Sequence, residues 1–231
     1  MINSVRNTVL AVCNKNNYGY ISPSDFNLFA KQAQLDIFED YFYQYNYQIN
    51  KINSHTTGTG YANLAEGLLE VIDSFSSVAT LANPTTNEYT LPADSYYNNE
   101  LRYNGVKVEK VSESKILNLT SSLLTAPTTQ WPAYVVRGNT AIVYPDTITG
   151  TVVDCQYVKY PLDPNWTYTA LLNGEPMFNQ SATDYQDFEL PISDEPMLVV
   201  KILQYAGISI REPEVYKTMS AMEAQENQQE S

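Results

Sequence analysis

Two similar stretches decide how this chain is organised, because each lies where a helical segment meets a strand-rich one. The first is Tyr89-Thr90-Leu91-Pro92-Ala93-Asp94, and the second is Phe188-Glu189-Leu190-Pro191-Ile192-Ser193-Asp194. Each contains a Leu-Pro pair, and proline interrupts regular backbone pairing because it has no N–H group to donate. We therefore expect an α+β fold with helices at both ends and a β-rich centre.

The chain has 231 residues, enough for one large or two small domains. Working outward from the two stretches, we expect a helical bundle over 1–80 and a β-rich domain over 81–190. Residues 191–231 should form carboxy-terminal helices, of which 191–210 should pack back on the helical bundle.

Apolar residues recur at helical spacing in the first third of the chain, which predicts three helices. The first covers about 2–13. The second is capped by Ser22, with Asp25 placed to reach back as in a capping box, and it runs to near Ile49. The third follows a polar connection and covers about 61–75.

The centre carries two hairpin signals and a strand with one apolar side. Asn104-Gly105 supplies the two positive φ angles of a type I′ turn within 101–108. A second hairpin is expected over 132–144, and a short helix over 112–124 should lie between the two. Apolar and polar residues alternate in 151–160, as in an antiparallel sheet with one wet side. We expect a small antiparallel sandwich or open barrel.

The carboxy-terminal part is predicted to hold two helices of different character. Residues 197–206 are apolar nearly all round, which indicates a helix buried in its own domain and closed by Gly207. The last helix starts near 212–213 and has a thin apolar stripe, so it is marginal alone and should order against a partner or else fray as a solvated tail. The stripe comprises Val215, Met219 and Met222, with Tyr216 beside it.

The charge balance and the absence of a long apolar run exclude some classes of protein. The chain has 26 acidic and 13 basic residues, a formal charge of −13. Since affinity for nucleic acids comes largely from lysine and arginine, this charge argues against direct, sequence-independent gripping of DNA. No apolar run is long enough to span a membrane. Cys13 and Cys155 are expected to be core residues without a disulfide, in a protein kept in a cytosol.

Residues suited to catalysis are sparse. The one histidine, His55, lies in a flexible Ser/Thr/Gly stretch where a general base would be poorly held. Asp36, Glu39 and Asp40 cluster at helical spacing, which is typical of a hydrated helix face. We therefore expect no catalytic residue, no metal ligand, no cofactor and no enzymatic activity.

Two further patterns have a structural and a binding interpretation. Residues 14–25 match the spacing of a calcium-binding EF-hand loop, but they offer only Asp25 where calcium needs several carboxylates. A joint between two helices is the favoured interpretation. Trp131 and Trp166 flank the strands and could form an aromatic platform for a sugar, although core and subunit contacts are favoured.

Taken together, the helical start, the stretch 89–94, hairpins ending near Tyr160-Pro161, and Leu190-Pro191 before a buried helix resemble a known family. This family is the head-to-tail connector or adaptor proteins of short-tailed bacteriophages, also called tail tubular or ring proteins. The opening, 5–10 through 20–23 to 31–35, looks especially like ring proteins of crAss-like phages.

The resemblance implies a structural protein of the virion tail, assembled in the host cytoplasm. Copies would form a homo-oligomeric ring, dodecameric by analogy, docked beneath the portal protein and beside other tail ring or hub proteins. DNA would pass through the lumen without specific binding, and acidic groups there would favour sliding. The carboxy-terminal segment of the family commonly inserts into the portal, which assigns the portal or ring contact to Val215, Tyr216, Met219 and Met222.

A closed ring needs two different, complementary faces on each subunit. The second predicted helix has a broad apolar arc, and its tyrosines are the candidates for the contact between subunits, with the third helix as an alternative mate for the arc. These tyrosines are Tyr41, Tyr43, Tyr45 and Tyr47. The competing hypothesis is a host-attachment or carbohydrate-binding tail module built on the β-rich centre.

Overall fold

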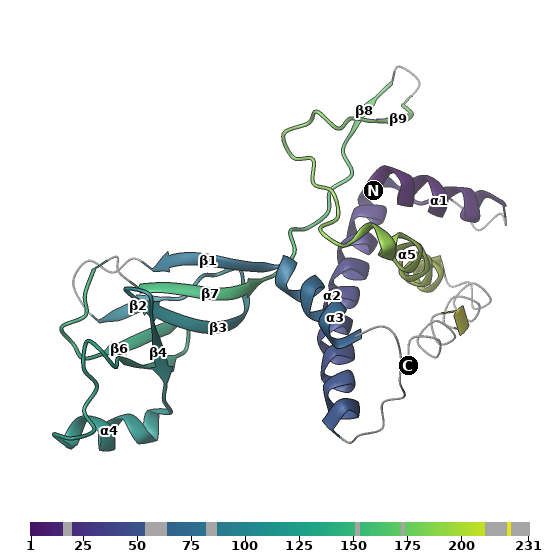
Figure 1. Cartoon of the computed structure of the whole chain (residues 1–231). Helices are drawn as coiled ribbons and strands as arrows, with labels where there is room; N and C mark the ends of the chain where they lie inside the picture. Colours follow the sequence, from purple (N-terminus) through teal and green to yellow (C-terminus); the bar gives the residue numbers. More distant parts are fainter. Residues whose placement is uncertain are drawn as a thin grey trace. The chain divides into compact units, whose positions relative to one another are not determined.

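The computed structural model describes residues 1–15, 20–53, 64–81, 87–150, 153–171, 174–210 and 221–222. It has two compact units, a helical unit of Met1–Val71 with Pro161–Ser231 and a sheet unit of Ile72–Tyr160. The described residues form five α-helices and a curled sheet, so the predicted α+β class is confirmed. Figure 1 shows how these elements follow one another along the chain. The predicted boundaries at 80/81 and 190/191 differ from the division of the structure into these two units, which falls at 71/72 and 160/161.

The helical unit is built from segments far apart in the sequence. Its helices are α1 (Ile2–Lys15), α2 (Pro23–Asn53) and α5 (Glu195–Ile210), together with most of α3 (Leu64–Ser74). Helix α5 packs against both α1 and α2 (Figure 1). The core of these three helices is mainly apolar, although Arg6, Gln34 and Lys201 are buried as well. Its almost completely buried apolar side chains include Ile2, Val5, Val9, Phe26, Ala30, Phe38, Leu198 and Ile202.

The ends of two helices differ from their predicted positions. Ser22 caps α2, since its hydroxyl accepts from the Asp25 N–H at 3.2 Å and donates to the Asp25 carboxylate at 2.6 Å. This helix continues to Asn53, beyond Ile49. Helix α5 does not close at Gly207 but continues to Ile210. A glycine inside a helix costs only about 1 kcal/mol relative to alanine, and the buried position of Gly207 allows packing to offset this cost.

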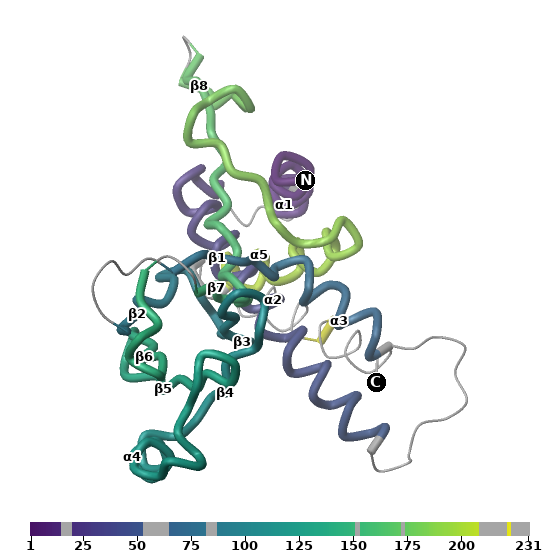
Figure 2. Tube along the Cα trace, turned by 60° about the vertical axis from the view of Figure 1, so that its left-hand side comes forward, coloured from purple at the N-terminus to yellow at the C-terminus, as the bar shows by residue number. Residues whose placement is uncertain are grey.

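The sheet unit contains one seven-stranded sheet in the order β1-β7-β3-β4-β5-β6-β2. Its strands are β1 (Ser76–Leu81), β2 (Glu88–Thr90), β3 (Ser95–Tyr103), β4 (Val106–Lys110), β5 (Ala133–Arg137), β6 (Thr140–Tyr144) and β7 (Val153–Lys159). All neighbours are antiparallel except β4 and β5, which are joined through helix α4 (Glu113–Ser121). Two parallel strands that follow each other in the sequence need a long crossover connection, because a tight turn reverses the direction of the chain and gives an antiparallel pair. The sheet curls into a half-barrel (Figure 2). Of the two predicted alternatives, the structure therefore has the open barrel and not the sandwich.

One face of this sheet carries the core of the unit. Along β7, the side chains of Val153, Cys155 and Tyr157 are buried, while Asp154 and Gln156 are more exposed. The predicted alternation is therefore confirmed. The same face contributes the fully buried Tyr89 from β2 and Leu101 from β3, as well as residues of β4, β5 and β6.

The two tight hairpins follow from their turn residues. Asn104 has φ 48° and Gly105 has φ 79°, the two positive angles that the predicted type I′ turn requires. In the β5–β6 hairpin, Gly138 has φ 61° at the first central position, as in a type II′ turn. These turns fix the register in which Leu101 faces Val108 and Val135 faces Ile142.

The segment 161–190, which we call the arm, was predicted to belong to the β-rich domain and belongs to the helical unit instead. It leaves the helices as an extended excursion and carries a small hairpin, β8 (Tyr168–Ala170) with β9 (Pro176–Phe178), at its end (Figure 1). A short 3₁₀ turn, η1 (Ile192–Asp194), then leads into α5. The Leu190-Pro191 pair thus ends the arm and not the main sheet.

Two glycine substitutions should change stability in opposite directions. Gly105→Ala places a side chain at φ 79° and should lower the free energy of unfolding by about 1–2 kcal/mol. Gly67→Ala lies within α3, where an added Cβ meets nothing within 4 Å, and should raise it by about 0.5–1 kcal/mol. Chemical denaturation of both variants beside the unsubstituted chain measures the two shifts. An unchanged Gly105→Ala midpoint would contradict the type I′ turn.

Candidate interaction surfaces

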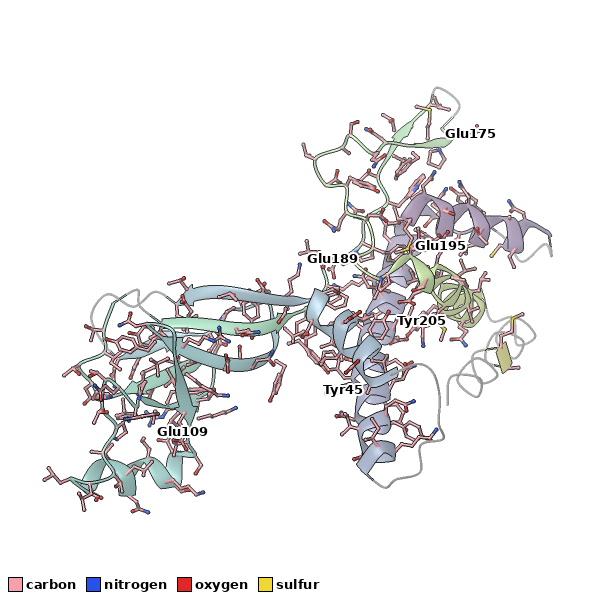
Figure 3. All side chains as sticks on the ribbon, in the orientation of Figure 1. Tyr45, Glu109, Glu175, Glu189, Glu195 and Tyr205 are labelled. Carbon is pink, nitrogen blue, oxygen red and sulfur yellow. The ribbon has the colours of Figure 1, made fainter. Side chains whose placement is uncertain are left out.

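The described residues contain no cluster of three or more His, Cys, Asp or Glu side chains that could hold a metal ion. Of the three carboxylates that clustered in the sequence, Asp36 and Asp40 form hydrogen bonds within the helical unit, and Glu39 is exposed. Asp36 accepts a hydrogen bond from the Tyr205 hydroxyl, and Asp40 accepts one from the Gln44 amide at 3.1 Å. Figure 3 shows Tyr205 on α5. His55 lies outside the described residues, as do 16–19 of the EF-hand-like stretch, whose Asp25 is used in the α2 cap.

The four tyrosines proposed for the subunit contact do not share one face of α2. Tyr41 is buried, and its hydroxyl donates to Asp194 just before α5, so its side chain serves the fold of the helical unit. Tyr45, one helical turn further on and labelled in Figure 3, is half-buried. Tyr43 and Tyr47 are exposed, Tyr43 to 71%. Residues two apart point to different sides of a helix, so Tyr43 and Tyr47 alone remain available for a partner.

Of the residues proposed for the portal contact, Met222 is described and is half-exposed. Val215, Tyr216 and Met219 lie outside the described residues. The two tryptophans differ in their exposure to solvent. Trp166 is only 2% exposed, so it cannot take part in an aromatic platform, whereas Trp131 is 78% exposed.

The base of the arm is tied to the first helix by a carboxylate. Asp187 accepts hydrogen bonds from the Met1 ammonium at 2.9 Å and from the Ile2 N–H at 2.7 Å, which places a negative charge at the amino-terminal end of α1. It also accepts one from the Phe188 N–H at 2.8 Å. Burial alone would raise the pKa of Asp187, but these hydrogen bonds, led by that of the ammonium, hold it below its ordinary value.

A second anchor of the arm is the buried Trp166. The Arg6 guanidinium of α1 lies 3.8 Å from the centre of its ring, and the indole N–H donates to Asn3 at 3.0 Å. The ring stacks on Tyr168 of β8 and on Phe178 of β9, with ring centroids 5.7 and 5.8 Å apart. The hairpin is therefore connected to the helices through a column of rings.

The Asp187 contacts should make the helical unit sensitive to acid. Because its pKa is lowered in the folded state, the unfolded chain takes up the proton first as the pH falls, and stability is lost below the ordinary carboxyl range. Thermal unfolding followed from near-neutral pH to about pH 3 should show a smaller fall in Tm for Asp187→Asn than for the unsubstituted chain. Glu175→Gln, which removes an exposed carboxylate at the outer end of the arm, is the control and should keep the steeper fall.

The outer end of the arm exposes apolar side chains beside acidic ones. Both strands of the hairpin are three residues long, and all of β8 is exposed. Two-stranded hairpins of this size are marginal in water unless they pack against something. Glu175 lies at the outer end in Figure 3 and is exposed. The exposed apolar residues of this hairpin are Tyr168, Leu171 and Met177.

A second exposed apolar surface, which we call the α4 surface, consists of Leu117, Leu123, Leu124 and Trp131. Leu123 is 100% exposed and Leu124 is 96% exposed. The predicted helix over 112–124 was too long, because α4 ends at Ser121 and leaves both leucines in the following loop. Reciprocal backbone hydrogen bonds between Thr128 and Trp131, at 3.2 and 3.1 Å, hold the end of that loop. The adjacent leucines were visible in the sequence, but the prediction placed them inside the helix.

Helix α4, which carries Leu117 of this surface, is anchored to the sheet unit. Ile116 is buried against Ala133 and Val135 of β5. An ion pair joins Glu113 to Arg137 at the end of the same strand. The exposed leucines therefore do not result from a helix that lacks packing on its other side.

The negative charge is concentrated in one unit. Counted along the sequence, the helical unit has eighteen acidic and seven basic residues, a net charge of −11, and the sheet unit has eight and six, a net charge of −2. Together these give the −13 of the whole chain. The arm contains five acidic residues and no basic one, whereas 107–137 contains four basic and two acidic residues.

The cysteines are free and buried, as predicted. Burial raises the pKa of Cys13, and it raises the pKa of Cys155 to about 11. Both thiols should therefore react slowly with maleimide or a disulfide reagent at neutral pH in the native protein, and promptly in denaturant. Thiol titration against time measures this, and a rapidly reacting thiol in the native state would contradict the burial.

A scan against protein-family models finds no match, and a search of curated proteins finds no relative. Among the helices of the described residues, none combines the length and the apolar character that a bilayer span requires. The surfaces described above are consequently the basis on which a function can be argued.

Proposed function

We propose that this protein is a structural subunit of a ring in the head-to-tail connector of a short-tailed bacteriophage. In this role it joins the portal to the tail and continues the channel for DNA. The observation that carries the proposal is the pair of apolar surfaces on different units, the arm hairpin and the α4 surface. Soluble monomers rarely expose large contiguous apolar patches, and such patches commonly mark contacts with other molecules.

A ring is favoured over a two-fold dimer by the difference between the two surfaces. In a closed ring, each subunit uses one face toward one neighbour and another face toward the next. The exposed Tyr43 and Tyr47 on α2 add a third area suited to protein contacts, because tyrosine combines an apolar ring with a polar hydroxyl. The resemblance of the sequence to connector and ring proteins points to the same kind of assembly.

The charge distribution supports a channel through which DNA moves without adhering. The helical unit has a net charge of −11, so any part of it that faces a lumen repels the phosphates of DNA. A protein that binds DNA tightly would need clustered lysine and arginine instead. The carboxy-terminal residues Val215, Tyr216, Met219 and Met222 are the proposed contact with the portal or an adjacent ring.

One observation favours a second candidate, a carbohydrate-binding tail module. Trp131 is 78% exposed, and an exposed indole ring is a surface on which a sugar could stack. Trp166 is buried, which removes the second ring from such a platform. The candidate therefore rests on a single aromatic side chain, whereas the ring proposal accounts for Trp131 together with the exposed leucines of the α4 surface.

Electron microscopy and mass measurement of the purified chain, with and without the portal protein of the same phage, test the proposal. We expect closed rings of about a dozen copies, alone or stacked coaxially on the portal, because heterologous contacts close when the rotation per subunit allows it. The control is a glycan-binding assay on the same preparation. A chain that stays monomeric at high concentration in the presence of portal, and that binds glycans, would favour the carbohydrate-binding module.

A further inference from the structure

We propose that the arm of one copy docks on the α4 surface of the next copy, and that this contact links subunits within the ring. The inference rests on the proposed function, since it assumes that copies assemble. It goes further by naming the two surfaces that meet. The second copy is chosen as the occupant because the two surfaces complement each other in charge and in apolar character.

The arm supplies the acidic partner. It carries five acidic residues and no basic one. Asp187 and Glu189 are used at its base, where Glu189 accepts the Leu162 N–H at 2.9 Å. Glu175 and Asp184 are exposed near the hairpin, beside the exposed Tyr168 and Met177. The column of rings on Trp166 holds this hairpin on the helical unit, so less ordering is needed when it binds.

The α4 surface supplies the opposite charge. Segment 107–137 has a net charge of +2 in a chain of −13. Among the described residues, Arg137 pairs with Glu113 and Lys107 pairs with Glu100, whereas neither Lys110 nor Lys115 forms a salt bridge. The two lysines line a shallow hollow together with Glu109, Leu119 and Thr125, so two positive charges stand beside one negative charge. Figure 3 shows the neighbouring Glu109 on β4, close to α4.

The two surfaces also resemble each other because both expose apolar side chains to water. Leu123 and Leu124 are almost fully exposed, and Trp131 is 78% exposed. Burial of exposed leucine and tryptophan side chains against a partner contributes strongly to the free energy of binding. Aromatic side chains in particular often dominate protein interfaces. The hairpin offers Tyr168, Leu171 and Met177 in return, and methionine adapts to irregular surfaces. Because the contact joins different faces, it propagates from copy to copy.

Cysteine crosslinking distinguishes this contact from other arrangements. Met177→Cys places a thiol on the arm, and Leu124→Cys places one on the α4 surface. Both positions are exposed, and the native cysteines are buried. With a short bis-maleimide, the double variant should give a ladder of covalent multimers, because each copy joins two neighbours. An equimolar mixture of the two single variants should stop at dimers. The control is Met177→Cys combined with Val78→Cys, which is also an exposed site and lies on β1.

A second measurement tests the energetic role of the surface. Leu123→Ser with Leu124→Ser should leave the fold intact, because both side chains are exposed, and should weaken association at least about tenfold, as expected for truncation of central interface residues. Lys110→Glu with Lys115→Glu should also weaken it, more at low salt than at high salt. Val78→Ser is the matched control and should have no effect on association.

The outcomes separate this inference from the proposed function. Rings in the microscope, with crosslinking of the double variant no greater than in the Val78 control, would overturn the arm contact and leave the ring standing. Absence of any oligomer, with or without portal, would overturn both. Binding of the unsubstituted chain to phosphatidylglycerol vesicles that is lost in the leucine variant, while rings persist, would assign the α4 surface to a membrane and overturn the inference.

Discussion

The helical unit depends on the return of the carboxy-terminal part of the chain onto the first helices. Helix α5 supplies Leu198 and Ile202 to a core otherwise made by α1 and α2, and neither side chain retains contact with water. Asp187 fixes the same return from the polar side, because it binds the amino-terminal end of α1. Burial of apolar side chains stabilises this arrangement but does not by itself determine how the segments are oriented. The Asp187 carboxylate determines the orientation, because it binds one end of α1.

The same constraint explains why the arm exists. The chain leaves the sheet unit at Tyr160 and reaches the α5 segment after the thirty residues of the arm. Both ends of the arm lie on the helices. Trp166 and Asn165 attach the outgoing part, the latter by accepting the Asn27 amide at 2.7 Å. Asp187 and Glu189 attach the returning part, so the segment between is held at both ends and projects as a hairpin. A projection fixed in this way can serve as a contact between molecules.

The two units divide the physical tasks of the proposed subunit. The sheet unit is nearly neutral, with its main core on one face of the half-barrel and a smaller cluster where α4 packs on β5. The helical unit carries most of the negative charge. The exposed side chains include Leu123, Leu124 and Trp131. We expect a partner to cover them, because exposed apolar surfaces commonly mark contacts with other molecules. Such a division suits a component that acts through its surfaces.

The sequence by itself determined the features that depend on neighbouring residues. The cap at Ser22, the turn at Asn104-Gly105 and the alternation along β7 were all predictable, because turn angles and side-chain periodicity are local properties. Tertiary structure decided the rest. Gly207 remains helical because its surroundings offset its low propensity, and Tyr41 is buried while Tyr43 is exposed because α5 covers only one side of α2. The position of the arm depends on Asp187 meeting a helix end that lies 185 residues earlier, a contact that no local pattern encodes.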